Sequence, residues 1–185
     1  MGKPRLLVFA GPNGSGKTTA TRGTPIVGTY VNADDIRVDA GCSDLEAAQA
    51  ATRLREALLG HGADFTFETV LSTDRNLDLL RRAKSAGYEI TSVFVLTVSA
   101  SINVARVRAR VSSGGHGVPE EKIRARYARS LANPPVLIGL SDVAIVIDNT
   151  GDEPAQIFAR DSRGQIVNET VDWSEEQIRK LVGVN

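Results

Sequence analysis

The stretch Gly11-Pro12-Asn13-Gly14-Ser15-Gly16-Lys17-Thr18 decides the fold of this 185-residue chain. It follows an apolar run over residues 5–10, which has the length and composition of a buried β-strand. A G-x-x-x-x-G-K-T pattern between a strand and a helix is typical of a phosphate-binding P-loop, whose backbone N–H groups surround a phosphate at the helix N-terminus. The alternative is an ordinary glycine turn between the two elements.

The P-loop interpretation predicts specific contacts with a nucleotide. Lys17 would reach the β- and γ-phosphates of ATP, and the Thr18 hydroxyl would hold a Mg²⁺ ion. ATP and Mg²⁺ are therefore the expected cofactors. The residues expected to contact the nucleotide are Gly11, Asn13, Gly14, Ser15, Gly16, Lys17, Thr18 and Thr19.

The composition is typical of one compact globular domain spanning residues 1–185, with 42% hydrophobic and 24% charged residues. No apolar run approaches membrane-spanning length, and residues 1–4 leave no room for a signal peptide. The single Cys42 can form no internal disulfide, which favours a reducing cytoplasm as the location. The net charge of zero argues against a general nucleic-acid or membrane-surface role.

Strand-like and helix-like segments alternate along the chain, which predicts an α/β fold. The apolar strand-like runs lie at residues 5–10, 26–31, 65–67, 90–98 and 143–147. The connections are too long for hairpins, so we expect βαβ units and a mainly parallel five-stranded sheet covered on both faces, a three-layer sandwich. The last run continues into Asp148 and Asn149, and this segment resembles a Walker B strand. We expect a structural role for it, or a role near the nucleotide base.

The C-terminal part departs from this alternation. Segments 155–160 and 165–170 flank Asp161-Ser162-Arg163-Gly164, a favourable hairpin turn. Trp173 and a short helix over residues 174–181 would pack this β-hairpin onto the sheet. We therefore expect a C-terminal appendage over about residues 152–185.

Polar residues that end strand-like runs are candidates for chemistry, because ligands of open α/β sheets lie beyond the carboxyl ends of the strands. Asp34 follows the second run and could accept a proton from a substrate hydroxyl as that hydroxyl attacks the γ-phosphate. The alternative is that Asp34 or Asp35 caps the following helix, and we expect capping for Asp35.

Glu68 and Thr69 end the third run and are expected to bind the substrate. A glutamate in this position is costly to bury unless it is paired, so it should face the cleft or meet an arginine. Glu68 could hydrogen-bond the hydroxyls of a substrate or a water on the metal. The alternative is a structural ion pair with Arg53 or Arg55.

A basic segment interrupts an otherwise acidic chain. Between residues 99 and 135, seven basic residues stand against two acidic ones, which suits an anionic ligand. We expect helices over residues 99–112 and 120–131, joined by a glycine-rich loop. Such a pair is a candidate lid over about residues 106–135, because lid closure excludes water from phosphoryl transfer.

Within this arginine-rich helical lid, the candidate catalytic residues are Arg106, Arg110 and Arg126. Arginine in a lid neutralises charge on the phosphoryl group in transfer. His116, in the glycine-rich loop, is a candidate phosphate or substrate contact. The alternative for any single arginine is a solvated surface side chain.

The segments GPNGSGKTT, NADDIR, FTFETVLS, GGHGVPEEKIRARYARSL and the late IDN together resemble the zeta-toxin family of small-molecule kinases, in particular its compact branch. The resemblance spans residues 5 to about 150. It implies a P-loop nucleoside-kinase-like sandwich that transfers the γ-phosphate of ATP to a hydroxyl of a sugar nucleotide, which is UDP-N-acetylglucosamine in the toxins. It also implies neutralisation by an antitoxin, which would be a separate protein, because no antitoxin-like helical bundle is visible in this chain.

The resemblance also implies residue roles. The family's P-loop lysine falls on Lys17, its substrate-activating aspartate on Asp34 and its substrate-binding glutamate on Glu68. Its lid arginines are placed, in order of preference, on Arg110, Arg106 and Arg126. The chain departs from the family in being much shorter than the well-studied toxins, and in carrying Val70 where relatives usually have a threonine.

The leading hypothesis is therefore an ATP- and Mg²⁺-dependent kinase that acts on a small hydroxylated molecule such as a UDP-sugar. A nucleic-acid end kinase or nucleoside kinase is an alternative, and zero net charge and few aromatic residues weigh against nucleic acid. A non-catalytic nucleotide-binding regulatory module is a further alternative. It would leave Asp34 and the lid arginines without a role.

Overall fold

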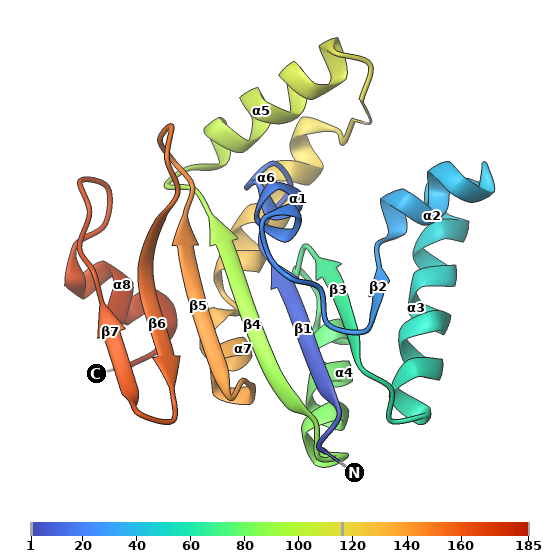
Figure 1. The fold of residues 1–185 in the computed structure, drawn as a ribbon. Helices are drawn as coiled ribbons and strands as arrows, with labels where there is room; N and C mark the ends of the chain where they lie inside the picture. The colour runs from blue at the N-terminus through green and yellow to red at the C-terminus, as the bar shows by residue number, and fades with distance from the viewer. Residues whose placement is uncertain (1, 116, 185) are drawn as a thin grey trace.

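The computed structural model describes residues 2–115 and 117–184. Within these residues the strands form one seven-stranded sheet in the order β2-β3-β1-β4-β5-β6-β7 (Figure 1). The strands are β1 (Arg5–Ala10), β2 (Thr29–Val31), β3 (Phe65–Thr69), β4 (Glu89–Leu96), β5 (Val143–Asp148), β6 (Ala155–Asp161) and β7 (Gly164–Val167). The predicted α/β class is confirmed.

The first five strands are parallel, and β1 lies between β3 and β4. Val8 of β1 is in register with Phe67 of β3 on one side and with Ser92 of β4 on the other. The carboxyl ends of all five strands therefore meet at one edge of the sheet, the upper edge in Figure 1. This edge carries the segment between β1 and the first helix.

Helices connect the parallel strands, and a last helix follows β7. They are α1 (Lys17–Arg22), α2 (Ala33–Ala40), α3 (Asp44–Gly60), α4 (Asp74–Ser85), α5 (Ala100–Ser112), α6 (Glu120–Leu131), α7 (Pro134–Leu140) and α8 (Glu175–Val182). The start of α3 illustrates how the sequence sets a boundary, because Ser43 and Glu46 form a reciprocal capping box. Among the described residues, no helix combines the length and the apolar character needed to cross a bilayer.

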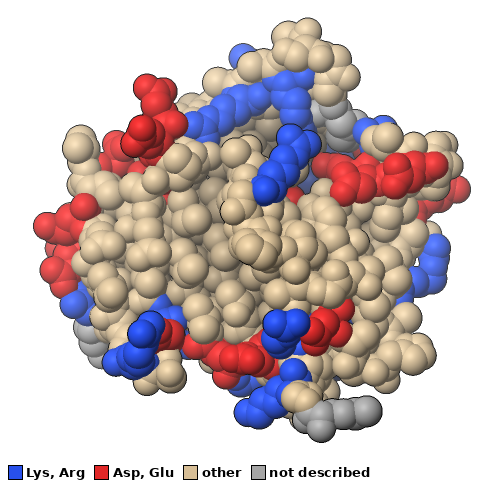
Figure 2. Space-filling view, in the orientation of Figure 1, with Lys and Arg blue, Asp and Glu red and all other residues tan. Residues whose placement is uncertain are grey.

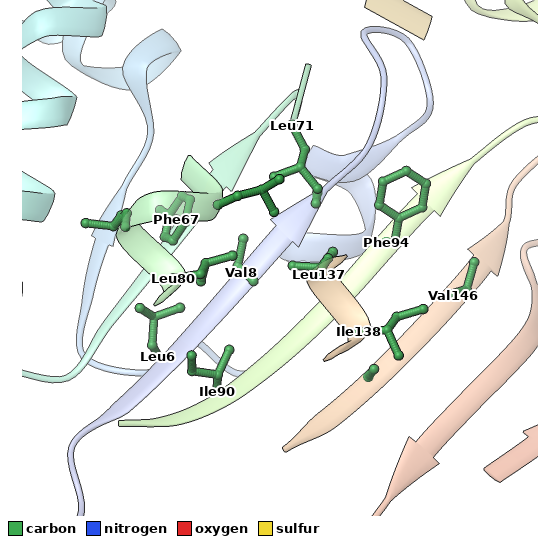
Figure 3. Close-up of a cluster of buried hydrophobic side chains, with 14 of the residues drawn as sticks. Leu6, Val8, Phe67, Leu71, Leu80, Ile90, Phe94, Leu137, Ile138 and Val146 are labelled. Carbon is green, nitrogen blue, oxygen red and sulfur yellow. The ribbon is translucent and has the colours of Figure 1, made fainter. Parts of the chain in front are cut away.

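The main hydrophobic core lies on one face of the sheet. Alternate residues of the strands, such as Val8, Phe67 and Phe94, point to this face and pack against Leu80 of α4 and Leu137 of α7 (Figure 3). Each of these side chains is almost completely buried. Burying a side chain of this size contributes roughly 1.5–3 kcal/mol, so this face fixes the register of the strands.

The opposite face of the sheet has less helical cover than the core face, so the cover on both faces that the sequence predicted is uneven. Its buried cluster includes Phe9 and Val95, packed against Ala20 of α1. Further along the sheet, β5 has its even-numbered residues buried and its odd-numbered residues, such as Ile145, half-exposed. Figure 2 shows this face as a broad surface with few charged residues.

The sheet is larger than the five strands predicted from the sequence. The C-terminal hairpin does not sit on the sheet as a separate appendage; β6 pairs antiparallel with β5, and β7 then pairs with β6. The predicted turn is confirmed, because Asp161 and Gly164 are partners on either side of it. Trp173 is buried in the main core with α8.

The second strand is shorter than predicted. The predicted run began at residue 26, but β2 begins at Thr29. Val27 bonds instead to a side chain, because its N–H donates to Thr66 Oγ1 at 2.9 Å and its carbonyl accepts from the same hydroxyl at 2.7 Å. Gly28, with a φ of 56°, then turns the chain into the strand.

Candidate functional site

The loop between β1 and α1 has the conformation that its glycines permit. Gly11 and Gly16 have φ values of 142° and 98°, in the region that side chains other than glycine rarely adopt. A Cβ atom on Gly11 would lie 1.9 Å from the carbonyl oxygen of Val95, and one on Gly16 would lie 2.2 Å from Nδ2 of Asn149. Both glycines are therefore required by the close approach of neighbouring elements, not by turn geometry alone.

Lys17 lies at the mouth of this loop and is half-buried. Its Nζ donates to the carbonyl oxygens of Gly11 at 2.8 Å and Pro12 at 3.0 Å. Burial lowers the pKa of Lys17 to about 8, and the carboxylates of Glu68 and Asp34 partly offset this effect. The ammonium group is thus held near two candidate site carboxylates by neutral backbone carbonyls, which phosphate oxygens could replace.

Glu68, at the end of β3, faces hydroxyl groups. Its Oε2 accepts from Thr18 Oγ1 at 3.1 Å, and its Oε1 accepts from Tyr30 OH at 2.6 Å. The Thr21 hydroxyl lies 2.9 Å from Oε1 and shares its proton with a backbone carbonyl. Among the described residues, Glu68 forms no ion pair with Arg53 or Arg55, the alternative considered from the sequence. The Arg55 guanidinium lies instead 5.1 Å from the ring centroid of Phe67.

A chain of hydrogen bonds runs from this carboxylate to the start of α2. Tyr30 OH, which donates to Glu68, accepts from Asn32 Nδ2 at 3.1 Å. Asn32 is the N-cap of α2, and its Oδ1 accepts from the backbone N–H of Asp34 at 2.9 Å. Thr18 of the P-loop and the candidate base Asp34 are therefore joined through Glu68, Tyr30 and Asn32.

Asp34 and Asp35 lie in the first turn of α2 and are exposed, while Asn32 provides the cap that was predicted for Asp35. Burial and the negative charges of Glu68 and Asp34 raise the pKa of Asp35. Asp34 acts on Lys17 electrostatically, as described above. The structure therefore brings Asp34, Glu68 and Lys17 into one neighbourhood, and their roles in catalysis and binding stay predictions.

The helices α5 and α6 form a pair beyond the strand ends, where the lid was expected (Figure 1). The positive charge of Arg110 acts on Lys17 and lowers its pKa. Arg106 instead donates to the backbone carbonyls of Asn149 at 2.7 Å and Thr150 at 3.2 Å. Arg126 lies half-buried on α6.

In the described part of the chain, the side chains of Thr69 and Thr19 form no bond to these groups. Thr69 is buried, and its hydroxyl accepts from the N–H of Leu71 at 2.9 Å and from Asn76 Nδ2 at 2.7 Å, so it shapes the loop after β3. Thr19 is exposed on α1. His116 lies outside the described residues.

Sequence reasoning did not single out Tyr30 and Asn32, and it left the role of Asn149 open. Asn149 Nδ2 donates to the carbonyl oxygen of Ser15 at 2.7 Å, which is a structural role at the P-loop. Asp148 is buried and accepts from the N–H of Thr150 at 3.1 Å. The available signal for Asn149 was its place directly after an apolar strand.

The charges around the site are divided by sign. Figure 2 shows basic side chains along α5 and acidic side chains over α2 on the other side of the P-loop edge.

Among the described residues, no group of three or more His, Cys, Asp or Glu side chains could hold a metal ion. The Thr18 hydroxyl and the Glu68 carboxylate are nevertheless hard oxygen donors of the kind that Mg²⁺ takes together with nucleotide phosphates, so these residues fit the expected metal.

The sequence was compared with protein families and with known proteins. No protein-family model matches the sequence. An uncharacterised protein of Haemophilus influenzae is 27% identical over 129 residues, which cover 66% of this chain and 92% of that protein.

Two solved complexes contain chains that are similar over nearly the whole of this one. A chain of the AvrRxo1-ORF1:-ORF2 complex with ATP has a TM-score of 0.72 and 17% identity over 97% of this chain. This chain spans only 64% of the length of that one. A chain of the PezAT chromosomal toxin-antitoxin system of Streptococcus pneumoniae has a TM-score of 0.59 and 15% identity, and the match covers 98% of this chain and 79% of the other. The chain therefore shares the α/β fold of these two chains.

Proposed function

We propose that this chain is an ATP- and Mg²⁺-dependent kinase that transfers the γ-phosphate to a hydroxyl group of a small molecule. The observation that supports it is the arrangement around Lys17. This ammonium group lies in the P-loop within electrostatic reach of Asp34 and Glu68 on one side and of Arg110 on the other. A base for the attacking hydroxyl and cations for the triphosphate are thus available at one strand edge.

The proposed reaction uses these groups as follows. Asp34 accepts the proton of the acceptor hydroxyl, whose oxygen forms the new bond to the γ-phosphorus. The bond from the γ-phosphorus to the β–γ bridging oxygen breaks, and ADP leaves. Lys17 and Arg110 neutralise charge on the phosphate oxygens, while bound Mg²⁺ supplies further charge neutralisation at the β- and γ-phosphates.

The acceptor that we propose is a nucleotide sugar such as UDP-N-acetylglucosamine, on the basis of the resemblance to zeta toxins. The test is to incubate the protein and ATP with a panel of UDP-sugars and nucleosides, and to look for an acceptor whose mass rises by one phosphate. Phosphorylation of a different small hydroxylated molecule would contradict the nucleotide-sugar assignment but support the kinase. ATP binding without transfer to any acceptor would instead support a regulatory module.

Asp34→Asn should reduce transfer to the identified acceptor by about 10²–10⁴-fold, because the amide cannot take the proton. Asp39→Asn is the matched control, because Asp39 is an exposed aspartate on the same helix. Equal rates for Asp34→Asn and the unmodified protein would show that Asp34 is not the base.

A nucleic-acid end kinase is the second candidate, and the contacts of the α5 arginines weigh against it. Arg108 forms an ion pair with Glu120, and Arg106 is bonded to backbone carbonyls. Arg106 would have to break its backbone bonds before it could contact a phosphate backbone. Binding of single-stranded ends with a steep dependence on salt would favour this candidate.

We also propose a separate antitoxin-like protein as a partner, because PezAT is a toxin-antitoxin system and shares the fold. The test is growth of cells that express this chain alone or together with the product of a neighbouring gene. Growth arrest that co-expression relieves would support the proposal, and growth unaffected by an active kinase would contradict it.

A further inference from the structure

We propose that Asn103 of α5 is a positioning residue: with ATP bound, its side-chain amide donates to the side-chain oxygen of Asn13, and this bond holds α5 against the P-loop. The proposal rests on the nucleotide binding described under the proposed function. Asn103 lies inside a helix and not at a strand end, so the sequence did not single it out.

Helix α5 packs directly on the backbone of the P-loop at Gly14. A Cβ atom on Gly14 would lie 2.6 Å from the carbonyl oxygen of Asn103 and 3.1 Å from its Cα atom. It would also lie 3.1 Å from Cγ2 of Val107, one turn further along α5. The first turns of α5 are therefore a wall of the P-loop, and a movement of the loop at Gly14 acts on this helix.

The side chain of Asn103 is only half satisfied. It is fully buried, and its Oδ1 accepts from the Thr97 hydroxyl. The amide also carries two N–H donors. Within the described residues, Nδ2 has no hydrogen-bond partner. One end of the amide is thus held by Thr97, and the other end is an unpaired donor.

The P-loop carries a complementary group beside this contact. Asn13 directly precedes Gly14, and its Oδ1 is a buried acceptor that likewise has no partner among the described residues. A buried polar group without a partner is destabilising, and such groups are few in folded proteins. A loop movement that pairs the Asn103 donor with the Asn13 acceptor would therefore be favourable.

A bound triphosphate is the event expected to cause that movement. The backbone N–H groups of a P-loop are drawn around the phosphates, and the Asn13 side chain moves with its own backbone. The helix on the other side of the contact carries Arg106, which bonds to the loop after β5, and Arg110, whose charge acts on Lys17. A bond between Asn13 and Asn103 would fix the start of the helix that presents both arginines.

The test is Asn103→Leu, which keeps the shape of the side chain and removes its polar atoms. The Thr97 hydroxyl retains the carbonyl oxygen of Ser99, at 3.1 Å, as an acceptor. The urea midpoint without ATP should stay the same or rise, because the variant removes an unpaired donor and leucine favours a helix more than asparagine does. ATP affinity, measured by calorimetry, should fall by about tenfold, because the bond to Asn13 cannot form.

A purely structural amide would give the opposite pair of results. The urea midpoint of Asn103→Leu would fall and the folded protein would bind ATP as tightly as before, which would overturn the proposal. Asn133→Leu is the matched control, because the Asn133 amide already donates to the carbonyl oxygen of Leu71 at 2.8 Å. It should lower the urea midpoint and leave ATP affinity unchanged. An equal loss of ATP affinity in both variants would also overturn the proposal, since the loss would then follow from general stability.

A double-mutant cycle tests the partner. Asn13→Ala combined with Asn103→Leu should weaken ATP binding no more than the more severe of the two single variants does. Ser15→Ala is the comparison, because Ser15 lies on the other side of Gly14 and its hydroxyl is also buried without a partner among the described residues. The effects of Ser15→Ala and Asn103→Leu on ATP affinity should multiply. Coupling of Asn103 to Ser15 and not to Asn13 would overturn the assignment.

Hydrogen exchange reports on α5 directly. Saturating ATP should slow the exchange of the α5 backbone amides in the unmodified protein, and most of this protection should be lost in Asn103→Leu at equal occupancy. Equal protection of α5 in both proteins would mean that Asn103 does not hold the helix.

The outcomes separate this inference from the proposed function. If the unmodified, folded protein binds no ATP, the proposed kinase itself fails. If ATP binds, and Asn103→Leu keeps both the full ATP affinity and the protection of α5, only the role of Asn103 fails.

Discussion

Asn149, directly after β5, donates from its side-chain amide to the carbonyl oxygen of Ser15 in the P-loop at 2.7 Å, across 134 residues of sequence. The same amide nitrogen would lie 2.2 Å from a Cβ atom on Gly16. Arg106 in turn donates to the backbone carbonyl of Asn149. The shape of the P-loop therefore depends on a loop at the far side of β4 and on a helix of the candidate lid.

The first prediction concerns Asn149→Ala. Removing the amide leaves the Ser15 carbonyl without this partner, so unfolding in urea should show a loss of about 1–3 kcal/mol. ATP affinity should fall by about tenfold, or ~1.4 kcal/mol, because the loop is no longer held in its binding conformation. Calorimetric titration with ATP measures the second effect.

The control for this prediction is Asn168→Ala. Asn168 also donates from its side chain to a backbone carbonyl, that of Gln156 at 3.0 Å, but this bond is exposed on the hairpin. Its removal should change stability by less than about 0.5 kcal/mol and leave ATP affinity unchanged. Equal ATP affinity in Asn149→Ala and in the unmodified protein would mean that the bond to Ser15 does not shape the loop.

The second prediction concerns pH. The pKa of Lys17 in the unliganded protein is about 8, and a triphosphate binds best to the charged form. ATP affinity should therefore decrease as the pH rises through 8, by about tenfold between pH 7 and pH 9, because only the charged fraction is competent to bind. The measurement is the ATP dissociation constant across this range at constant ionic strength.

The same shift affects stability with the opposite sign. Between pH 8 and the ordinary lysine value of 10.5, the unfolded chain keeps the proton that the folded protein has released. The contribution of Lys17 to the free energy of unfolding therefore rises with pH in this window. Lys17→Arg remains charged throughout and should remove both pH dependences; their persistence in that variant would assign them to another group.

The sequence predicted the parts of the molecule that depend on local patterns. The P-loop, the parallel strands and the hairpin turn at Asp161 each have a short-range signature. The sequence did not predict that the hairpin would pair with β5, because pairing partners are chosen by long-range packing. It also placed the start of β2 too early, since the Val27 bonds to Thr66 join residues that are 39 apart.

The candidate site was predictable to the same extent. Lys17 was predicted from the P-loop motif, and Asp34 and Glu68 were predicted because polar residues at strand ends are visible in the sequence. The hydrogen bonds that position them were not, because Tyr30 and Glu68 are 38 residues apart and Asn149 and Ser15 are 134 apart. A tyrosine in a short strand and an asparagine after one are common residues, and only the fold brings them to the P-loop.

The third prediction concerns Tyr30→Phe. This variant removes the hydroxyl that donates to Glu68 and accepts from Asn32, so it breaks the connection between the P-loop and the N-cap of α2. Stability should fall by about 1.5–3 kcal/mol, the range for a hydrogen bond to a charged group. Transfer to the acceptor should also fall, because Asp34 is held through Asn32, and kcat should change more than KM for ATP.

Tyr88→Phe provides the comparison for Tyr30→Phe. The Tyr88 hydroxyl also donates to polar partners, the carbonyls of Ala63 and Leu58, at the opposite end of the strands. This variant should lose stability without a specific fall in kcat. A similar fall in kcat for both variants would show that Tyr30 acts through general stability alone.

The last prediction concerns Arg110→Ala, which separates two effects of one charge. The positive charge of Arg110 lowers the pKa of Lys17, so its removal should raise that pKa. The decrease in ATP affinity with rising pH should then begin at a higher pH than in the unmodified protein. If Arg110 also stabilises the phosphoryl group in transfer, kcat should fall by about 10–1,000-fold at every pH.

Arg108→Ala is the control on the same helix. Arg108 pairs with Glu120, so this variant should leave kcat and the pH dependence of ATP affinity unchanged. A fall in kcat with no movement of the pH dependence would mean that Arg110 meets the phosphate only in the closed, reacting complex.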